Sequence, residues 1–135
     1  MASAADQPTA SILGLEQYHG QVVYVDFWAS WCGPCRASFP FMNRMHSQYS
    51  DEGLVIIGVN VDNERAEADG FLAQMPADFQ ITYDHDAVLA RRLGVSAMPH
   101  SFLFGRDGSL IQQHKGFRKE DPVGLEQAIK AALSE

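Results

Sequence analysis

Two cysteines carry the clearest chemical signal in this sequence of 135 residues. Cys32 and Cys35 are the only cysteines in the chain, and Gly33 and Pro34 separate them. Side chains at positions i and i+3 of a helix lie on one face, so the two sulfur atoms can meet. A C-x-x-C pair that follows a strand and begins a helix is typical of a dithiol/disulfide centre.

The start of a helix also makes the first cysteine reactive. Backbone N–H groups at a helix N-terminus are unpaired and the helix dipole is positive there, so a thiolate is stabilised and the pKa of the Cys32 thiol falls. Pro34 fits the first helical turn, because its missing N–H would have had no partner within the helix. The sequence therefore predicts a helix that begins at Gly33, directly after Cys32.

Two other interpretations of the cysteine pair find less support. A structural zinc site needs four ligands, usually from a second C-x-x-C or a pair of histidines. The chain has no third cysteine, and its 5 histidines are scattered. A purely structural disulfide would constrain the unfolded chain little, because the loop that it closes is short. We therefore expect a redox-active pair and no metal site.

Asp26 is the second residue of chemical interest. It interrupts an apolar segment, residues 21–28, which is predicted to be a strand buried on both faces. A carboxylate inside a buried strand is costly unless it is paired, and its pKa should rise. We expect Asp26 to accept the proton of Cys35, directly or through water. The alternative is an aspartate at a strand end that reaches solvent.

The segment Val25–Cys35, with the sequence VDFWASWCGPC, resembles the active-site segment of thioredoxins. Over residues 12–133 the chain is most similar to the TlpA/ResA-like thiol–disulfide oxidoreductases of bacterial envelopes. The resemblance implies a thioredoxin-like α/β fold and an enzyme that exchanges thiols and disulfides. Thioredoxins carry an aspartate at the place of Asp26, whereas many TlpA-like proteins lack an acid there, so this position is closer to thioredoxin proper.

The implied mechanism is thiol–disulfide exchange. Cys32 is the exposed nucleophile, and Cys35 resolves the mixed disulfide that forms. Asp26 accepts or relays the proton from Cys35. No cofactor is expected besides the redox-active Cys32–Cys35 disulfide, and Trp28 is expected to pack beneath the site.

Pro99 matches the cis-proline that packs beside the dithiol in the thioredoxin fold. A cis bond at this place leaves the backbone of Met98 free to pair with an extended substrate chain. Gly116 is expected to mark a close approach of the backbone near the site, as a matching glycine does in the family. The predicted substrate groove consists of Trp31, Gly33, Pro34, Met98, Pro99 and Gly116.

His100 stands where the family commonly has threonine. Either this residue points away from the site within its strand, or it tunes Cys32 or contacts substrate, because histidine titrates near neutral pH. Cytochrome-maturation members often carry an acidic residue directly after the cis-proline, and His100 argues against that pathway. Together with Cys32, Cys35 and Met98, His100 would also suit Cu(I), which leaves a copper-binding chaperone as an alternative function.

The elements that position these residues form one domain, at residues 12–135, after a disordered tail at 1–11. The predicted fold is a central mixed β-sheet flanked by helices on both faces, with the last strand antiparallel to three parallel strands. An extra helix at 64–75, inserted between the second strand and the cis-proline loop, resembles the insertion of TlpA/ResA-type proteins; we expect it to select partners or to cover the core. The strands are expected at 21–28, 54–61, 79–82, 101–104 and 109–114, and the other helices at 33–50, after Asp86 and from Asp121, with Asp62, Asp86 and Asp121 as N-terminal caps.

Composition excludes several function classes. The chain is 46% hydrophobic and 20% charged, as expected of a globular domain, and it has no apolar run near the roughly 18 residues that span a membrane. A net charge of −7 without a basic patch argues against nucleic acid and anionic membrane surfaces as partners. The segment Ala2–Ala4 has the A-x-A form of a signal-peptidase site. We therefore expect a periplasmic or otherwise extracytoplasmic protein whose signal peptide is absent from this chain, with the cytoplasm as the alternative.

The predicted function is reduction of protein disulfides in the bacterial cell envelope. Gly33 and Pro34 between the cysteines resemble the reducing thioredoxins, whereas oxidising relatives usually carry a histidine in the motif. The implied partners are protein disulfide substrates and an upstream dithiol electron donor, either thioredoxin-like or a membrane transmembrane reductase. The protein is expected to be a monomer. A disulfide oxidant or isomerase remains an alternative.

Overall fold

A computed structural model describes residues 9–135 of the chain. The elements in chain order are α1 (Thr9–Ile12), η2 (Glu16–Tyr18), β1 (Val22–Trp28), α2 (Gly33–Tyr49), η3 (Ser50–Glu52), β2 (Leu54–Asn60), α3 (Arg65–Gln74), β3 (Gln80–Tyr83), η4 (His85–Ala87), α4 (Val88–Arg92), β4 (His100–Phe104), β5 (Leu110–Lys115) and α5 (Asp121–Leu133), where η denotes a short 3₁₀ helix.

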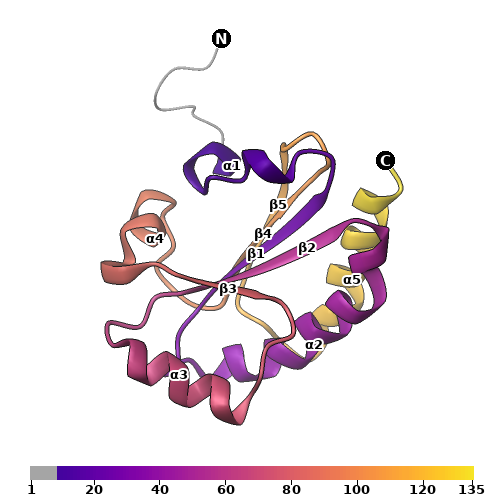
Figure 1. Ribbon diagram of the computed structural model, residues 1–135. Helices are drawn as coiled ribbons and strands as arrows, with labels where there is room; N and C mark the ends of the chain where they lie inside the picture. Colours follow the sequence, from indigo (N-terminus) through magenta and orange to yellow (C-terminus); the bar gives the residue numbers. More distant parts are fainter. Residues whose placement is uncertain (1–8) are drawn as a thin grey trace.

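The strands form one 5-stranded mixed sheet in the order β3-β2-β1-β4-β5. β1 lies at the centre, and residues from Val22 to Trp28 are all buried, as expected of a strand covered on both faces. In Figure 1, α2, α3 and α5 lie on one side of the sheet and α1 and α4 lie on the other. The prediction of a central mixed sheet with helices on both faces is confirmed.

The predicted strand directions are wrong at the end of the sheet. β1, β2 and β3 are parallel, but β4 is antiparallel to β1, and β5 is antiparallel to β4. The last strand therefore runs in the same direction as β1. The cause is the short crossover: α4 has 5 residues and spans roughly 7 Å, too little to carry the chain back along a strand. β4 consequently starts at the same end of the sheet at which β3 ends.

Each face of the sheet has its own hydrophobic core. The first core lies under α2, α3 and α5 and contains an aromatic cluster of Trp28, Phe39, Phe71 and Phe79, with ring centroids 4.9 to 5.2 Å apart. The second core lies under α1 and α4. It contains alternate residues of the central strands, such as Val25 and Phe27.

The helix after the cysteines forms as predicted. Phe39, Met42 and Met45, which recur at helical spacing, are fully buried against the first core. Pro40 lies inside α2, and the helix continues through it to Tyr49.

The predicted boundary of the N-terminal tail is too late in the sequence. Residues 9–11 belong to α1 instead of a disordered tail. Ala10 and Leu13 pack against the second core and Leu15 is buried, so apolar contacts hold this segment on the sheet. Residues 1–8, including the predicted signal-peptidase motif Ala2–Ala4, lie outside the described residues.

The helix caps differ from the prediction. Asp86 has a φ of 64° and does not cap α4. The carboxylate of Asp84 instead accepts hydrogen bonds from the backbone N–H groups of Leu89 (3.0 Å) and Ala90 (2.9 Å). Asp121 is the first residue of α5, and its carboxylate accepts from the backbone N–H of Arg118.

Across residues 9–135, no helix combines the length and the apolar character that a membrane crossing requires.

Candidate active site

The two cysteines form a disulfide at the start of α2. Cys32 is the N-cap residue with extended backbone angles, and its sulfur accepts a hydrogen bond from the backbone N–H of Cys35 at 3.2 Å. Cys35 is completely buried, whereas Cys32 is 5% exposed. Cys32 is thus the more accessible sulfur, although less exposed than predicted, and any attack on it must come along a narrow approach.

The loop before Cys32 is held by a buried carboxylate that the sequence interpretation missed. Asp62 accepts hydrogen bonds from the backbone N–H of Ser30 (2.9 Å) and from its hydroxyl (2.8 Å). The side-chain amide of Asn60 donates a third bond to the same carboxylate at 2.8 Å. The prediction that Asp62 caps the following helix is wrong, because its oxygens point across to the β1–α2 loop. The available signal was a polar pair, Asn60 and Asp62, directly after a buried strand.

The two tryptophans beside the dithiol have opposite environments. Trp31 is 67% exposed and lies next to Cys32, on the surface where a substrate would approach. Trp28 is fully buried and packs against Phe39 and Phe71, as predicted for a residue beneath the site. Of the pair, only Trp31 can contribute to a substrate groove.

Asp26 is buried in the central strand on the same face as the dithiol core. It is 2% exposed, so the alternative of a solvent-facing aspartate at a strand end is wrong. Among the described residues, its Oδ2 atom has no hydrogen-bond partner. Burial raises the pKa of this carboxyl well above its ordinary value. Asp26 is therefore an acid that holds its proton more tightly than a surface aspartate.

A backbone hydrogen bond joins Pro99 and Gly116, which lie in different loops. The Met98–Pro99 peptide bond is cis, and Pro99 is buried. The backbone N–H of Gly116 donates to the carbonyl of Pro99 at 2.7 Å, and its predicted place near the dithiol stays a prediction. Gly116 has a φ of +80°, a conformation that favours glycine. Met98 is half-buried and contacts both cores.

His100 faces away from the dithiol. It is paired with Phe27 and stacks on Phe102, with ring centroids 4.7 Å apart, so it belongs to the face of the second core. Its Nε2 atom lies 2.9 Å from Oε1 of Gln113, and burial lowers the pKa of the imidazole. The interpretation in which His100 points away from the site is therefore confirmed, and the one in which it tunes Cys32 by direct contact is not. The predicted copper ligand set also loses His100, because Cys32 and Cys35 belong to the first core.

The inserted helix α3 covers the core beneath the site. Phe71 packs on Trp28, and the guanidinium of Arg36 lies 5.0 Å from the centre of the Phe71 ring. Arg36 also donates to the side-chain oxygen of Gln74 at 3.3 Å. After the helix, the side chain of Asn43 bonds the carbonyl of Pro76 at 3.0 Å. These contacts fasten the insertion to α2, so core cover is an observed role, while partner selection stays a prediction.

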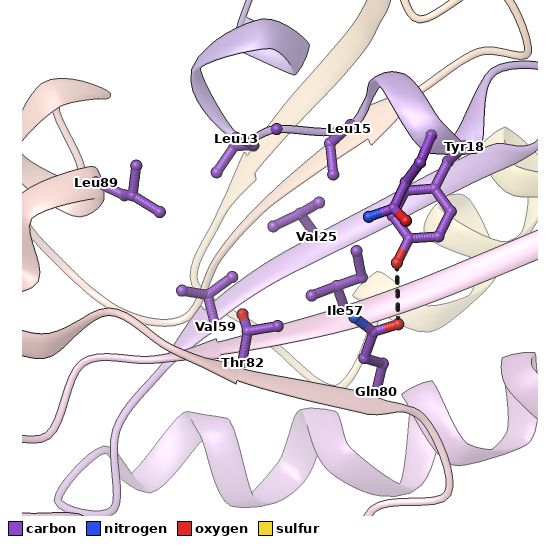
Figure 2. A pocket seen from close by; sticks show the side chains of 11 residues that line it. Leu13, Leu15, Tyr18, Val25, Ile57, Val59, Gln80, Thr82 and Leu89 are labelled. Atoms are coloured by element: carbon purple, nitrogen blue, oxygen red, sulfur yellow. Dashed lines mark hydrogen bonds between the residues drawn. The ribbon is translucent and has the colours of Figure 1, made fainter.

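A separate cavity lies on the opposite face of the sheet. Figure 2 shows it beneath the η2 segment, with a hydrogen bond of 3.1 Å from the Tyr18 hydroxyl to Gln80 at its rim. Its volume is about 110 Å³, and its walls include the apolar side chains of Leu13, Leu15, Val25, Ile57, Val59 and Leu89. These residues belong to the second core or pack on it, so the cavity is not part of the dithiol site.

Comparison with known proteins agrees with this geometry. The Redoxin family model matches residues 5–129. The thiol-disulfide oxidoreductase ResA of Bacillus thuringiensis subsp. konkukian is 31% identical over 116 residues, which cover 86% of this chain and 66% of that protein. The chain thus spans slightly less than two thirds of that curated relative, and 61% of ResA from Bacillus subtilis strain 168, to which it is 27% identical over 81% of its own length.

A solved structure gives a closer match. A candidate thiol:disulfide interchange protein DsbE from Chlorobium tepidum is 50% identical, with a TM-score of 0.85, and the match covers 88% of this chain and 84% of that one. The extent of the family match and the thioredoxin-like architecture lead to one assignment. The chain belongs to the Redoxin family and is a thioredoxin-superfamily protein of the TlpA/ResA-like type.

Proposed function

We propose that the chain is a protein thiol–disulfide oxidoreductase that reduces protein disulfides in the bacterial cell envelope. The observation that carries this proposal is the Cys32–Cys35 disulfide at the start of α2, beside the core that holds the buried acid Asp26. The names of the ResA and DsbE relatives support the same chemistry. Gly33 and Pro34 between the cysteines favour the reducing direction.

The reaction begins with the reduced protein. The Cys32 thiolate is stabilised by the helix N-terminus and by the N–H of Cys35, and it attacks one sulfur of a substrate disulfide. The other substrate sulfur leaves as a thiolate. Cys35 then gives its proton to Asp26 and attacks Cys32, which releases the second substrate thiolate and leaves the Cys32–Cys35 disulfide. Two electrons pass from the dithiol to the substrate.

The groove for the substrate is assigned to the exposed rim of the dithiol. Trp31 supplies an exposed apolar surface, and Gly33 and Pro34 form the helix start between the sulfurs. The backbone of Met98, next to cis-Pro99, would pair with an extended peptide. An upstream dithiol protein, soluble or membrane-bound, would reduce the disulfide again, and the protein would act as a monomer.

The deciding measurement is the reduction potential of the Cys32–Cys35 couple, equilibrated against glutathione or dithiothreitol buffers. A potential near the thioredoxin value of about −270 mV is expected for a reductase. A potential near about −120 mV would contradict the reducing role and make the protein a disulfide donor. Insulin reduction with dithiothreitol tests the activity itself: Cys32→Ser should abolish turnover, and Cys35→Ser should accumulate a mixed disulfide with the substrate.

A further inference from the structure

A row of polar side chains crosses the sheet on the face that α2 and α5 cover. Asp26 in β1 is directly opposite Ser101 in β4, and Ser101 is directly opposite His114 in β5. Directly paired residues point to the same face of a sheet, with Cβ atoms about 5 Å apart. The three side chains therefore form a continuous line from the centre of the sheet to its edge. Asp26 and Ser101 are 2% and 5% exposed, so this part of the line is buried in an otherwise apolar core.

Tyr24 lies beside this row. It precedes Asp26 by two residues, so its side chain points to the same face, and its buried hydroxyl lies beside that of Ser101. Burial raises the pKa of the Tyr24 phenol far above its ordinary value, and the carboxylates of Asp26 and Asp121 raise it further. The hydroxyl is thus within electrostatic reach of both acids, one at each end of the row.

The outer end of the row opens to solvent. Nε2 of His114 lies 2.9 Å from Oδ2 of Asp121, and the two side chains are 30% and 16% exposed. Both line a hollow of about 290 Å³, to which Glu120 also contributes. Hydrogen bonds from the backbone of Arg118 and from His114 lower the pKa of Asp121, so this carboxylate is ionised at neutral pH. The row ends at a group that can exchange protons with water.

On its other side, toward β2, Asp26 has no strand partner with a polar side chain among the described residues. Its partner in β2 is Gly58, which offers no side chain. A Cβ atom there would lie 3.1 Å from Trp28 Nε1, so the aromatic cluster fills this space. In the ladder around Asp26, polar side chains therefore continue toward β4 and β5 alone.

We propose that Ser101, Tyr24 and His114 form a proton path that connects Asp26 with the hollow beside α5. The inference rests on the proposed function, since it supplies the step by which Asp26 is reset between turnovers. After Cys35 has transferred its proton, Asp26 is a neutral acid. Only 2% of Asp26 is exposed, so water reaches its proton poorly. The hydroxyls of Ser101 and Tyr24 each accept one proton and pass on their own. His114 receives a proton on its imidazole and releases one to water, so one proton moves from the Cys35 thiol to solvent and the path is left unchanged.

If this path exists, a substitution that interrupts it should slow proton exchange between Asp26 and solvent. A pH jump on the oxidised protein, followed through the infrared band of the Asp26 carboxyl, measures this rate without any turnover; Asp26→Asn identifies the band. Ser101→Ala, Tyr24→Phe and His114→Ala should each slow the relaxation about tenfold. This is below the usual effect of an acid or base that touches the reacting atoms, because water at the dithiol mouth offers a second route. His19→Ala, which removes an exposed histidine elsewhere, should have no effect.

Added imidazole separates proton transfer from a structural or electrostatic role. In His114→Ala, imidazole should enter the hollow and restore the relaxation rate in proportion to its concentration, while Tyr24→Phe should not respond. Relaxation rates equal to those of the unaltered protein in all three variants would overturn the path. The path would also be overturned if His114→Ala shifted the midpoint of the Asp26 titration but left the relaxation rate unchanged and unaffected by imidazole. His114 would then act through its charge alone. A failed insulin assay with a slowed relaxation would instead contradict the proposed function and leave the path intact.

Discussion

At the scale of single residues, Asp26 is where burial and charge conflict most directly. Its carboxyl lies in the central strand with one oxygen lacking a partner among the described residues. Because burial raises its pKa, the folded chain binds this proton more tightly than the unfolded chain does. The free energy of unfolding contributed by this group is therefore greatest below its ordinary pKa of 3.8 and falls as the pH rises toward the raised value.

Asp26→Asn should remove this loss of stability. The amide stays neutral at every pH, so the variant should gain about 1 to 3 kcal/mol at pH 8, the usual penalty for an unsatisfied buried group, and less at pH 5. Urea denaturation of the oxidised protein at both values measures the difference. The same variant should react more slowly in single turnovers, because Cys35 loses its proton acceptor. A gain in stability that is independent of pH would contradict the assignment of the raised pKa to Asp26.

Asp62 is the second residue whose role depends on position. Asp62→Ala should cost about 1 to 3 kcal/mol, because the backbone N–H of Ser30 and the amide of Asn60 lose their shared acceptor. The released loop should also weaken substrate binding at Trp31, seen as an increase in KM for a peptide disulfide. Asp62→Asn keeps one acceptor oxygen and should recover part of both effects. Equal KM values for the two variants and the unaltered protein would show that the loop needs no such support.

The sequence could predict the cysteine pair, the buried aspartate and the packing of Trp28, because each depends on a local pattern. It could not predict the role of Asp62, since its partner Ser30 lies 32 residues earlier and becomes a neighbour only when β1 and β2 pair. The orientation of His100 was equally hidden, because a strand position alone does not say which face carries the site. A sequence motif thus identifies which residues are functional, whereas the register of the sheet decides to which face each side chain points.

At the scale of elements, the inserted helix α3 covers the aromatic cluster of the first core. Ala68 and Phe71 are its buried residues, and Phe71 closes the space between Trp28 and Phe39. The predictions for α2 and β1 followed from their apolar residues, which are periodic in α2 and nearly continuous in β1. The direction of β4 was missed, because it depends on the length of α4, and short helices have weak periodic signals.

Phe71→Ala should destabilise the protein by about 3 to 5 kcal/mol through loss of the ring and the cavity left behind. Trp28 should then show a fluorescence change, because its ring loses one neighbour. Glu67→Ala, at an exposed position of the same helix, serves as the matched control and should change stability little. If the unfolding free energy of Phe71→Ala equalled that of the control, α3 would have no role in covering the core.

At the scale of the whole molecule, Arg106 joins three segments at the end of the sheet away from the dithiol. Its guanidinium donates to the carbonyls of Gly20 (2.9 Å), Glu52 (3.1 Å) and Leu133 (2.9 Å). Gly53 makes room for it, because a Cβ atom there would lie 2.8 Å from Arg106 Nη1. The start of β1, the turn before β2 and the end of α5 are therefore tied to the β4–β5 hairpin.

Arg106→Ala should lower the free energy of unfolding by about 2 to 3 kcal/mol, since several charge-assisted hydrogen bonds are lost. Arg106→Lys should recover only part, because an ammonium cannot reproduce the planar fork. Denaturant unfolding gives both values. The reduction potential of the cysteine pair should stay unchanged in both variants, and a shift in that potential would show that the two ends of the sheet are coupled.

The Arg106 contacts also have a mechanical consequence. A pulling force applied at the end of α5 acts on a segment that the Arg106 guanidinium holds at Leu133, next to the start of β1. Figure 1 shows the end of α5 on the side of the molecule away from the start of α2. The chain can therefore be attached to a surface or fused to another protein through the end of α5. The dithiol would then face away from the attachment point.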